Sequence, residues 1–204
     1  MKTTALKTLS LICVSFGLMT AVPNSASAQS AEEIMKRAKE IKEFKDMLNH
    51  ADETVRLAAL DAMLSSKDLA MRELAYSAGF ASVDDTMRAI ALRKKIAETG
   101  ELNIELSITA DDEKQFKSYI SNFGKNRTLR VQNYSINNGN FNARFIRYEN
   151  HQSAGQGSIS GLRLDASQDN CYISTTLNDE SVLEGTLTCR GYKDASVPIK
   201  INVI

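Results

Sequence analysis

Residues 52–96 read DETVRLAALDAMLSSKDLAMRELAYSAGFASVDDTMRAIALRKKI, and this stretch repeats itself every 16 residues. Each unit carries an aspartate followed four positions later by an arginine: Asp52/Arg56, Asp68/Arg72 and Asp84/Arg88. The same step links four sets of apolar positions: Val55/Met71/Met87, Ala59/Ala75/Ala91, Leu60/Tyr76/Leu92 and Leu64/Phe80/Ile96. Within a unit these positions share one face of an α-helix.

Each unit therefore predicts one helix of about 12 residues, about 18 Å long. Short turns are expected at Ser65–Ser66 and Ala81–Ser82. One such helix cannot bury its apolar stripe alone, so the three helices must stack. The aspartate opening each helix can accept backbone N–H bonds and complements the helix dipole. The arginine one turn later is placed to pair with its own aspartate or with that of a neighbouring helix.

A further helix is expected before the repeats. Ser30 and Glu33 form a capping box, with a hydroxyl at the N-cap and a carboxylate three residues on. Five apolar residues then follow at helical spacing: Ile34, Ala38, Ile41, Phe44 and Leu48. This helix lacks the Asp…Arg pair, as terminal units of stacked repeats commonly do.

The repeated segment resembles HEAT-like α-solenoid repeats, in which an aspartate, a Val-Arg pair and an Ala-Ala pair recur. Asp52, Val55-Arg56 and Ala58-Ala59 match that pattern best. The resemblance covers about a quarter of the 204-residue chain, and it implies a short stack of helices that offers a surface to a protein partner.

The amino terminus predicts export. Lys2 and Lys7 precede an apolar run, and Ala26-Ser27-Ala28 ends it, which is the pattern of a signal peptide over residues 1–28. Removing Lys2 and Lys7 leaves 25 − 2 = 23 Lys+Arg against 25 Asp+Glu, a formal charge of −2. This balance does not indicate a nucleic-acid-binding surface, and no membrane span is expected after cleavage. The expected location is the periplasm or the exterior.

At Gly100 the pattern changes from helix to strand. Residues 29–100 predict the α-helical repeat module, and residues 101–204 predict a mostly antiparallel β domain with one helix near 109–123. The segment 155–164 reads as one glycine-interrupted strand. The predicted fold class is thus α+β: a short α-helical repeat module followed by an antiparallel β-sandwich or barrel of about six or seven strands.

Two hairpins are indicated in the β domain. Asn137-Asn138-Gly139-Asn140 predicts a turn between strands at 128–136 and 141–148, with a bulge because the apolar alternation changes phase. In the last hairpin, one register pairs Leu177 with Leu183 and Ile173 with Leu187. The same register sets Cys171 opposite Cys189, so we predict a disulfide between them.

The first hairpin also carries a set of basic residues. Four arginines, Arg127, Arg130, Arg144 and Arg147, lie in a segment without any acidic residue between Glu113 and Glu149. The simplest register sets Arg130 opposite Arg147, which is unfavourable unless an anion lies between them. These four arginines are the candidate ligand-binding residues; a solvated face, or pairing with acids from elsewhere, is the alternative.

Catalytic and metal-binding patterns are weak. Asp46 and His50 have the spacing of two metal ligands on a helix but lack a third, and His151 lacks a nucleophile motif. The acidic run 111–113 is expected in the first turn of the 109–123 helix. Asp165 and Asp169 do not have the spacing of a calcium loop. We therefore expect neither cofactor, metal nor catalysis.

The expected function is that of an exported, non-catalytic binding module, with a protein as its partner. The alternative is recognition of an anionic cell-envelope carbohydrate, or another anionic ligand, by the β domain.

Overall fold

A computed structural model describes residues 30–146, 154–191 and 196–204 of the chain. The predicted signal peptide, Arg147 and His151 lie outside the described residues. The helices are α1 (Ala31–Leu48), α2 (Glu53–Leu64), α3 (Leu69–Phe80), α4 (Asp85–Thr99) and α5 (Lys117–Phe123). The strands are β1 (Glu101–Leu106), β2 (Asn126–Gln132), β3 (Asn140–Ile146), β4 (Gly155–Ser160), β5 (Arg163–Gln168), β6 (Cys171–Leu177), β7 (Val182–Cys189) and β8 (Val197–Asn202).

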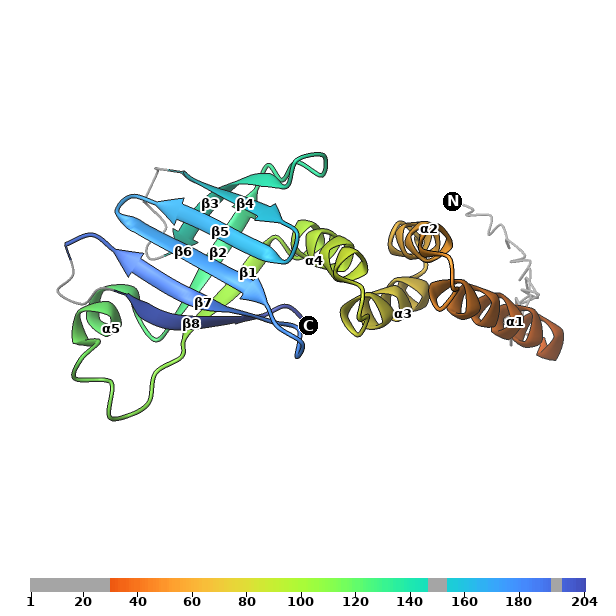
Figure 1. Cartoon of the computed structure of the whole chain (residues 1–204), viewed down its shortest axis with the longest axis horizontal. Coiled ribbons are helices and arrows are strands. Elements are labelled where there is room, and N and C mark those ends of the chain that lie inside the picture. Colours follow the sequence, from red (N-terminus) through yellow and green to blue (C-terminus); the bar gives the residue numbers. More distant parts are fainter. Residues whose placement is uncertain (1–29, 147–153, 192–195) are drawn as a thin grey trace, which may run out of the picture.

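The repeated aspartates cap the helices as predicted. The carboxylates of Asp52, Asp68 and Asp84 each accept a hydrogen bond from the backbone two residues on, at 2.8 Å in all three cases. Ser30 and Glu33 form the capping box at the start of α1. Figure 1 shows the four helices stacked in order, with α1 farthest from the strands.

Small residues allow the helices to approach closely. Ala75 and Ala91 are fully buried, and a Cβ added at Gly79 would lie 2.8 Å from the Cβ of Ala91 and 3.3 Å from a methyl group of Leu60. Each of these contacts joins a different pair of the helices α2, α3 and α4. The small positions of the repeat therefore set the distance between the helices.

Replacing Ala75 with leucine should lower the free energy of unfolding by about 1–3 kcal/mol, because the added volume meets a packed interior. Chemical denaturation of Ala75→Leu and of the exposed-site control Lys67→Ala measures the difference. Equal unfolding midpoints for the two variants would contradict the close packing of the stack.

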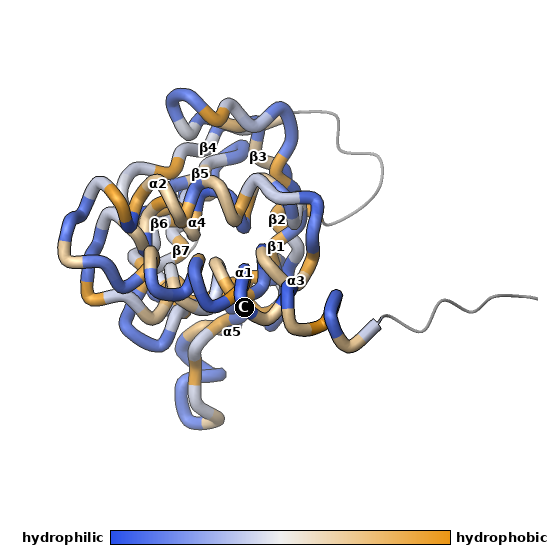
Figure 2. The backbone as a smooth tube through the Cα atoms, turned by 90° about the vertical axis from the view of Figure 1, so that its right-hand side faces the viewer, coloured by the Kyte–Doolittle hydropathy of each residue, from blue (hydrophilic) through white to orange (hydrophobic). Residues whose placement is uncertain are grey.

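The strands form a closed eight-stranded antiparallel barrel. Each strand pairs with its neighbours in sequence, and β1 pairs with β8 to close the sheet. Figure 1 shows this barrel beyond α4, and the end-on view in Figure 2 shows β1 to β7 arranged around a circuit. The barrel alternative of the predicted fold class is thus correct, whereas a sandwich and six or seven strands are not.

The extra strand arises within the segment 155–164. This segment contains all of β4 and the start of β5, because the chain reverses at Gly161, which has a φ of 57°. β4 and β5 pair through Ile159 and Leu164. Glycine adopts a positive φ readily, so the residue that looked like an interruption of one strand is the turn between two.

Alternate side chains fill the barrel. Ile104, Leu129, Leu164, Ile173 and Ile201 point inward from five different strands and are fully buried. An eight-stranded barrel has an interior just wide enough for such side chains.

The predicted helix at 109–123 is wrong over its first half. Residues 110–116 form turns, and only α5 is helical. The Asp112 carboxylate accepts hydrogen bonds from the backbone N–H and the hydroxyl of Thr109, at 3.0 and 2.7 Å. Such local bonds compete with helix formation. Glu113 pairs instead with Lys125, the residue before β2.

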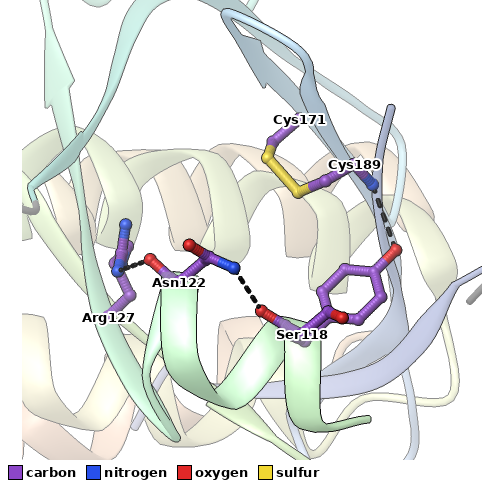
Figure 3. The surroundings of a disulfide bond; sticks show 6 residues. Ser118, Asn122, Arg127, Cys171 and Cys189 are labelled. Atoms are coloured by element: carbon purple, nitrogen blue, oxygen red, sulfur yellow. Dashed lines mark hydrogen bonds between the residues drawn. A yellow bond between two sulfur atoms is a disulfide. The ribbon is translucent and has the colours of Figure 1, made fainter. Parts of the chain in front are cut away.

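The last hairpin has the predicted register and the predicted disulfide. Leu177 lies opposite Leu183, and Cys171 lies opposite Cys189 and is bonded to it. Figure 3 shows this disulfide facing α5. The Tyr119 hydroxyl of α5 accepts a hydrogen bond of 3.1 Å from the backbone N–H of Cys189. The pairing of β7 with β8 ends two residues earlier, so Tyr119 satisfies an N–H group that the sheet does not.

Replacing Tyr119 with phenylalanine should destabilise the barrel by about 1–3 kcal/mol, because it leaves the buried Cys189 N–H without this acceptor. Tyr172→Phe is the matched control, since Tyr172 is exposed. Urea unfolding of both variants with the disulfide intact provides the measurement. A smaller loss for Tyr119→Phe than for Tyr172→Phe would contradict this role of the hydroxyl.

Two arginines of α4 attach the helix stack to the barrel. Arg88 is only 7% exposed and donates hydrogen bonds to the carbonyl oxygens of Leu177 and Asn178 in the β6–β7 turn. Arg93 donates to the carbonyl oxygen of Ile136, in the β2–β3 loop, at 2.6 Å. Across the three described segments, no helix is both long and apolar enough to cross a membrane.

Candidate functional site: the open end of the helix stack

A series of arginine–aspartate pairs joins alternate helices of the stack. Arg56 of α2 contacts Asp84, the N-cap of α4, with Nη2 3.0 Å from Oδ2. Arg37 of α1 pairs in the same way with Asp68, the N-cap of α3. The sequence left open whether a repeat arginine reaches its own or a neighbouring aspartate, and Arg56 reaches one two helices further along the chain.

Two of the repeat arginines, Arg56 and Arg72, also bind the turn before their own helix. Nη1 of Arg56 donates to the carbonyl oxygens of His50 and Ala51, both at 3.0 Å. Nη1 of Arg72 donates to the carbonyl oxygen of Ser66 at 3.2 Å. These bonds satisfy carbonyl groups of the turns. Nη2 of Arg56 remains for the ion pair with Asp84.

The series ends at α4. One repeat after Asp84 the sequence has Gly100 in place of an aspartate, so Arg72 has no carboxylate to meet there. Its Nε is buried and has no hydrogen-bond partner within the described residues. Arg88 pairs with Asp85 and with Asp179 of the β6–β7 turn, at 3.3 and 3.4 Å. The barrel therefore takes the place of the next helix.

The other end of the series is open. Asp52 is exposed, and among the residues that the structure describes it makes no ion pair. Its carboxylate bonds to the backbone N–H of Thr54, which lowers its pKa. Two repeats further on, the equivalent residue is Asp84, which receives Arg56. Asp52 is thus a capping aspartate without the arginine that its counterpart has.

An apolar groove of about 360 Å³ lies between α1 and α2. It is lined by Phe44, Met47, Thr54, Val55, Ala58, Ala59 and Ala62. Met47 is 42% exposed, and Ala58 and Ala62 are also exposed. Among the described residues, Thr54 supplies the only polar side chain of the lining, so the groove offers an apolar surface that includes three alanines.

The repeat identifies what this groove corresponds to elsewhere in the stack. A shift of two repeats maps Ala58 onto Ile90 and Ala62 onto Lys94 of α4. Neither of those residues is exposed, and α2 packs against α4. Nζ of Lys94 lies 3.1 Å from Oγ of Ser65 and 3.5 Å from Oδ1 of Asp61, both at the end of α2. The groove on α2 is therefore the face that on α4 is covered by another helix.

Arg56 holds the pKa of Asp84 below its ordinary value, chiefly through the hydrogen bond between the two side chains. A carboxyl group with a lowered folded-state pKa stabilises the fold above its unfolded-state pKa, about 3.9. That contribution is lost as the pH falls through the folded-state pKa. The ion pair between Arg56 and Asp84 should therefore stabilise the helix stack less in acid than at neutral pH.

Asp84→Asn keeps a good N-cap residue but removes the charge. It should unfold at lower urea concentration than the wild-type protein at pH 7, and the difference should shrink below about pH 4 as the wild-type carboxyl becomes protonated. Urea titrations at several pH values measure both effects. Asp46→Asn, on the exposed face of α1, is the control. A difference that grows on acidification would contradict the pairing.

The arginines of the β domain are distributed differently from the prediction. The structure pairs Arg130 with Arg144, not with Arg147. β2 ends at Gln132 because Asn133 has a φ of 51°, so the Asn-Asn-Gly turn belongs to a longer loop than predicted. The change of phase in the apolar alternation of this hairpin therefore occurs at Asn133.

Acids and aromatic rings from other elements meet these arginines. Arg130 bonds to Glu101 of β1 at 2.8 Å, which relieves its repulsion with Arg144. Arg127 donates to the carbonyl oxygen of Asn122 at 3.0 Å, and its guanidinium lies 4.2 Å from the ring centre of Phe123. Arg144 has a buried Nε without a hydrogen-bond partner in the described part of the chain. The structure thus brings Arg130 and Arg144 together and places Arg127 against α5.

The described residues contain no cluster of three or more histidine, cysteine, aspartate or glutamate side chains that could hold a metal ion. His50 accepts a hydrogen bond from the backbone N–H of Asp52 at 3.0 Å. Asp165 is bonded to Arg163 and Tyr172.

The sequence pointed to the repeated aspartates and arginines but not to the groove beside α2. A signal for it was present, since alanines at positions 58 and 62 replace the larger Ile90 and Lys94 of the equivalent helix. Comparisons with protein-family models, with curated proteins and with solved structures find no match to this chain.

Proposed function

We propose that the protein is a non-catalytic binding module whose open helix stack receives an α-helix of a partner protein. The proposal rests on the comparison of one face of α2 with the face of α4 that is equivalent to it in the repeat. The face of α4 marked by Ile90 and Lys94 is covered by α2, whereas the equivalent face of α2 is an open apolar groove. An apolar groove of this shape is how proteins commonly take up an amphipathic helix.

The site also specifies the chemistry of its occupant. A helix that lay on α2 as α2 lies on α4 would bury an apolar stripe against Val55, Ala58 and Ala62. It would bring a basic side chain to Asp52 as Arg56 comes to Asp84. The partner helix is therefore amphipathic and carries an arginine beside its apolar face.

The predicted export agrees with one structural feature. The Cys171–Cys189 disulfide is typical of oxidising compartments outside the cytosol. We therefore place the interaction in the periplasm or outside the cell, where the partner is to be sought.

A photo-crosslinking residue at Ala62 tests the proposal in the cell of origin. We expect a crosslink to another polypeptide, and mass spectrometry should map it to a helix with an apolar stripe and an arginine. The same crosslinker at the exposed Lys67, outside the groove, should not capture that polypeptide. Crosslinks to a second copy of this chain, to residues 1–29 of the same molecule, or to no protein would each overturn the proposal.

The charge requirement is tested with a matched pair of variants. Asp52→Asn should reduce the yield of the crosslinked partner, because the cap is kept while the carboxylate that meets the partner's arginine is lost. Asp84→Asn removes the equivalent charge inside the stack, where Arg56 already pairs with Asp84. It should leave the crosslinking yield unchanged under conditions where the variant is folded. Equal crosslinking yields from Asp52→Asn and the wild-type protein would contradict the proposed contact between Asp52 and an arginine of the partner.

A further inference from the structure

A second surface, on the barrel, has a different chemistry from the helix groove. It is a hollow of about 510 Å³ over the outer face of β3, β4, β5 and β6, bordered by the β2–β3 loop. Its lining consists of Asn133, Ser135, Asn140, Phe141, Asn142, Gln156, Gly157, Ser158, Asp165, Ala166, Ser167 and Tyr172. Most of these side chains carry an amide or a hydroxyl group.

The strand register arranges the polar side chains in two rows. One row runs across four strands from Asn142 to Gln156, Ser167 and Tyr172, each residue lying opposite the next. The adjacent row runs from Asn140 to Ser158 and Asp165. Neighbouring strands are about 4.8 Å apart, so each row presents hydrogen-bonding groups at a regular interval.

The amide groups in these rows are free to bind a ligand. Within the described residues, the side chains of Asn142 and Gln156 make no hydrogen bond. An amide side chain offers two N–H donors and a carbonyl acceptor, which can engage two adjacent hydroxyl groups at once. The hollow therefore holds unused donors and acceptors side by side.

The charge of the hollow excludes a strongly ionic ligand. Of the described residues, Asp165 is the only charged one in the lining, although a quarter of the chain is charged. Its carboxylate is neutralised by Arg163, with Nε and Oδ2 at 2.7 Å. A ligand rich in hydroxyl groups and without net charge fits such a surface better than a phosphate or a carboxylate.

Tyr172 supplies an aromatic surface at one edge of the hollow. It is 42% exposed, and its hydroxyl donates a hydrogen bond of 2.7 Å to Oδ1 of Asp165. Nη2 of Arg163 donates to the same hydroxyl at 3.4 Å. These bonds hold the ring in place, so that an apolar face is presented beside the amides. The C–H face of a pyranose ring can pack on a tyrosine while its hydroxyls meet amides.

We propose that this hollow is a binding site for a neutral oligosaccharide. Tyr172 packs against one sugar ring, and Asn142 and Gln156 bind the hydroxyl groups of that ring or the next. The site is built by the barrel alone and does not depend on the helix groove.

The test is binding of the mature protein to an array of neutral and acidic oligosaccharides, followed by titration with the best neutral one. We expect neutral glycans to be retained. Tyr172→Ala and Gln156→Ala should each weaken binding at least about tenfold, a difference of about 1.4 kcal/mol. Tyr172→Phe, which keeps the ring, should lose less than Tyr172→Ala.

Thr176→Ala is the matched control, because Thr176 is exposed on β6 outside the hollow. Asp52→Asn should also bind glycans like the wild type, which separates this site from the helix groove. Thermal unfolding of each variant shows whether the barrel is intact. Retention of acidic glycans alone, of no glycan, or equal binding by Tyr172→Ala and wild type would overturn the proposal.

Discussion

The arginines of the repeat need acceptors away from water, and this requirement sets how the parts of the molecule are arranged. A guanidinium cannot lose its charge at any ordinary pH, so burial obliges it to find carboxylates or carbonyl groups. Arg56 meets this need by joining α2 to α4, and Arg88 by joining α4 to the β6–β7 turn. One sequence motif therefore stacks the helices and also attaches them to the barrel. Where the motif has no further layer, as at Asp52, an open surface results.

In the barrel, side-chain acceptors bind backbone N–H groups where the pairing of two strands is short. β3 pairs with β4 only as far as Ala143 and Gly155, and the backbone N–H of Phe145 donates instead to the buried side chain of Gln168 from β5. Tyr119 has the corresponding role for Cys189 at the end of β7. Polar side chains thus complete the ladder where a neighbouring strand ends, since a buried N–H without an acceptor is costly.

The two proposed surfaces lie on different parts of the molecule and recognise different chemistry. The helix groove lies between α1 and α2, and α1 is the helix farthest from the barrel (Figure 1). The lining of the groove is apolar apart from the hydroxyl of Thr54. The barrel hollow is polar and almost without charge. A module that binds a glycan through one surface and a protein helix through the other would hold that partner beside the carbohydrate.

The sequence by itself determined the local features. Helix caps at Asp52, Asp68 and Asp84 and the register of the last hairpin followed from residue spacing, because each depends on neighbours within a few residues or on a two-residue alternation. The disulfide between Cys171 and Cys189 followed from that register. Two local predictions were wrong because a competing local signal was overlooked: Asp112 bonds back to Thr109 and replaces half of a helix with turns, and Gly161 divides one strand into two. Barrel closure, the pairing of Arg56 with Asp84, the separation of the candidate arginines and the open face of α2 were decided only by the tertiary structure. Each depends on which surfaces meet across long stretches of chain, and spacing along the sequence does not record that.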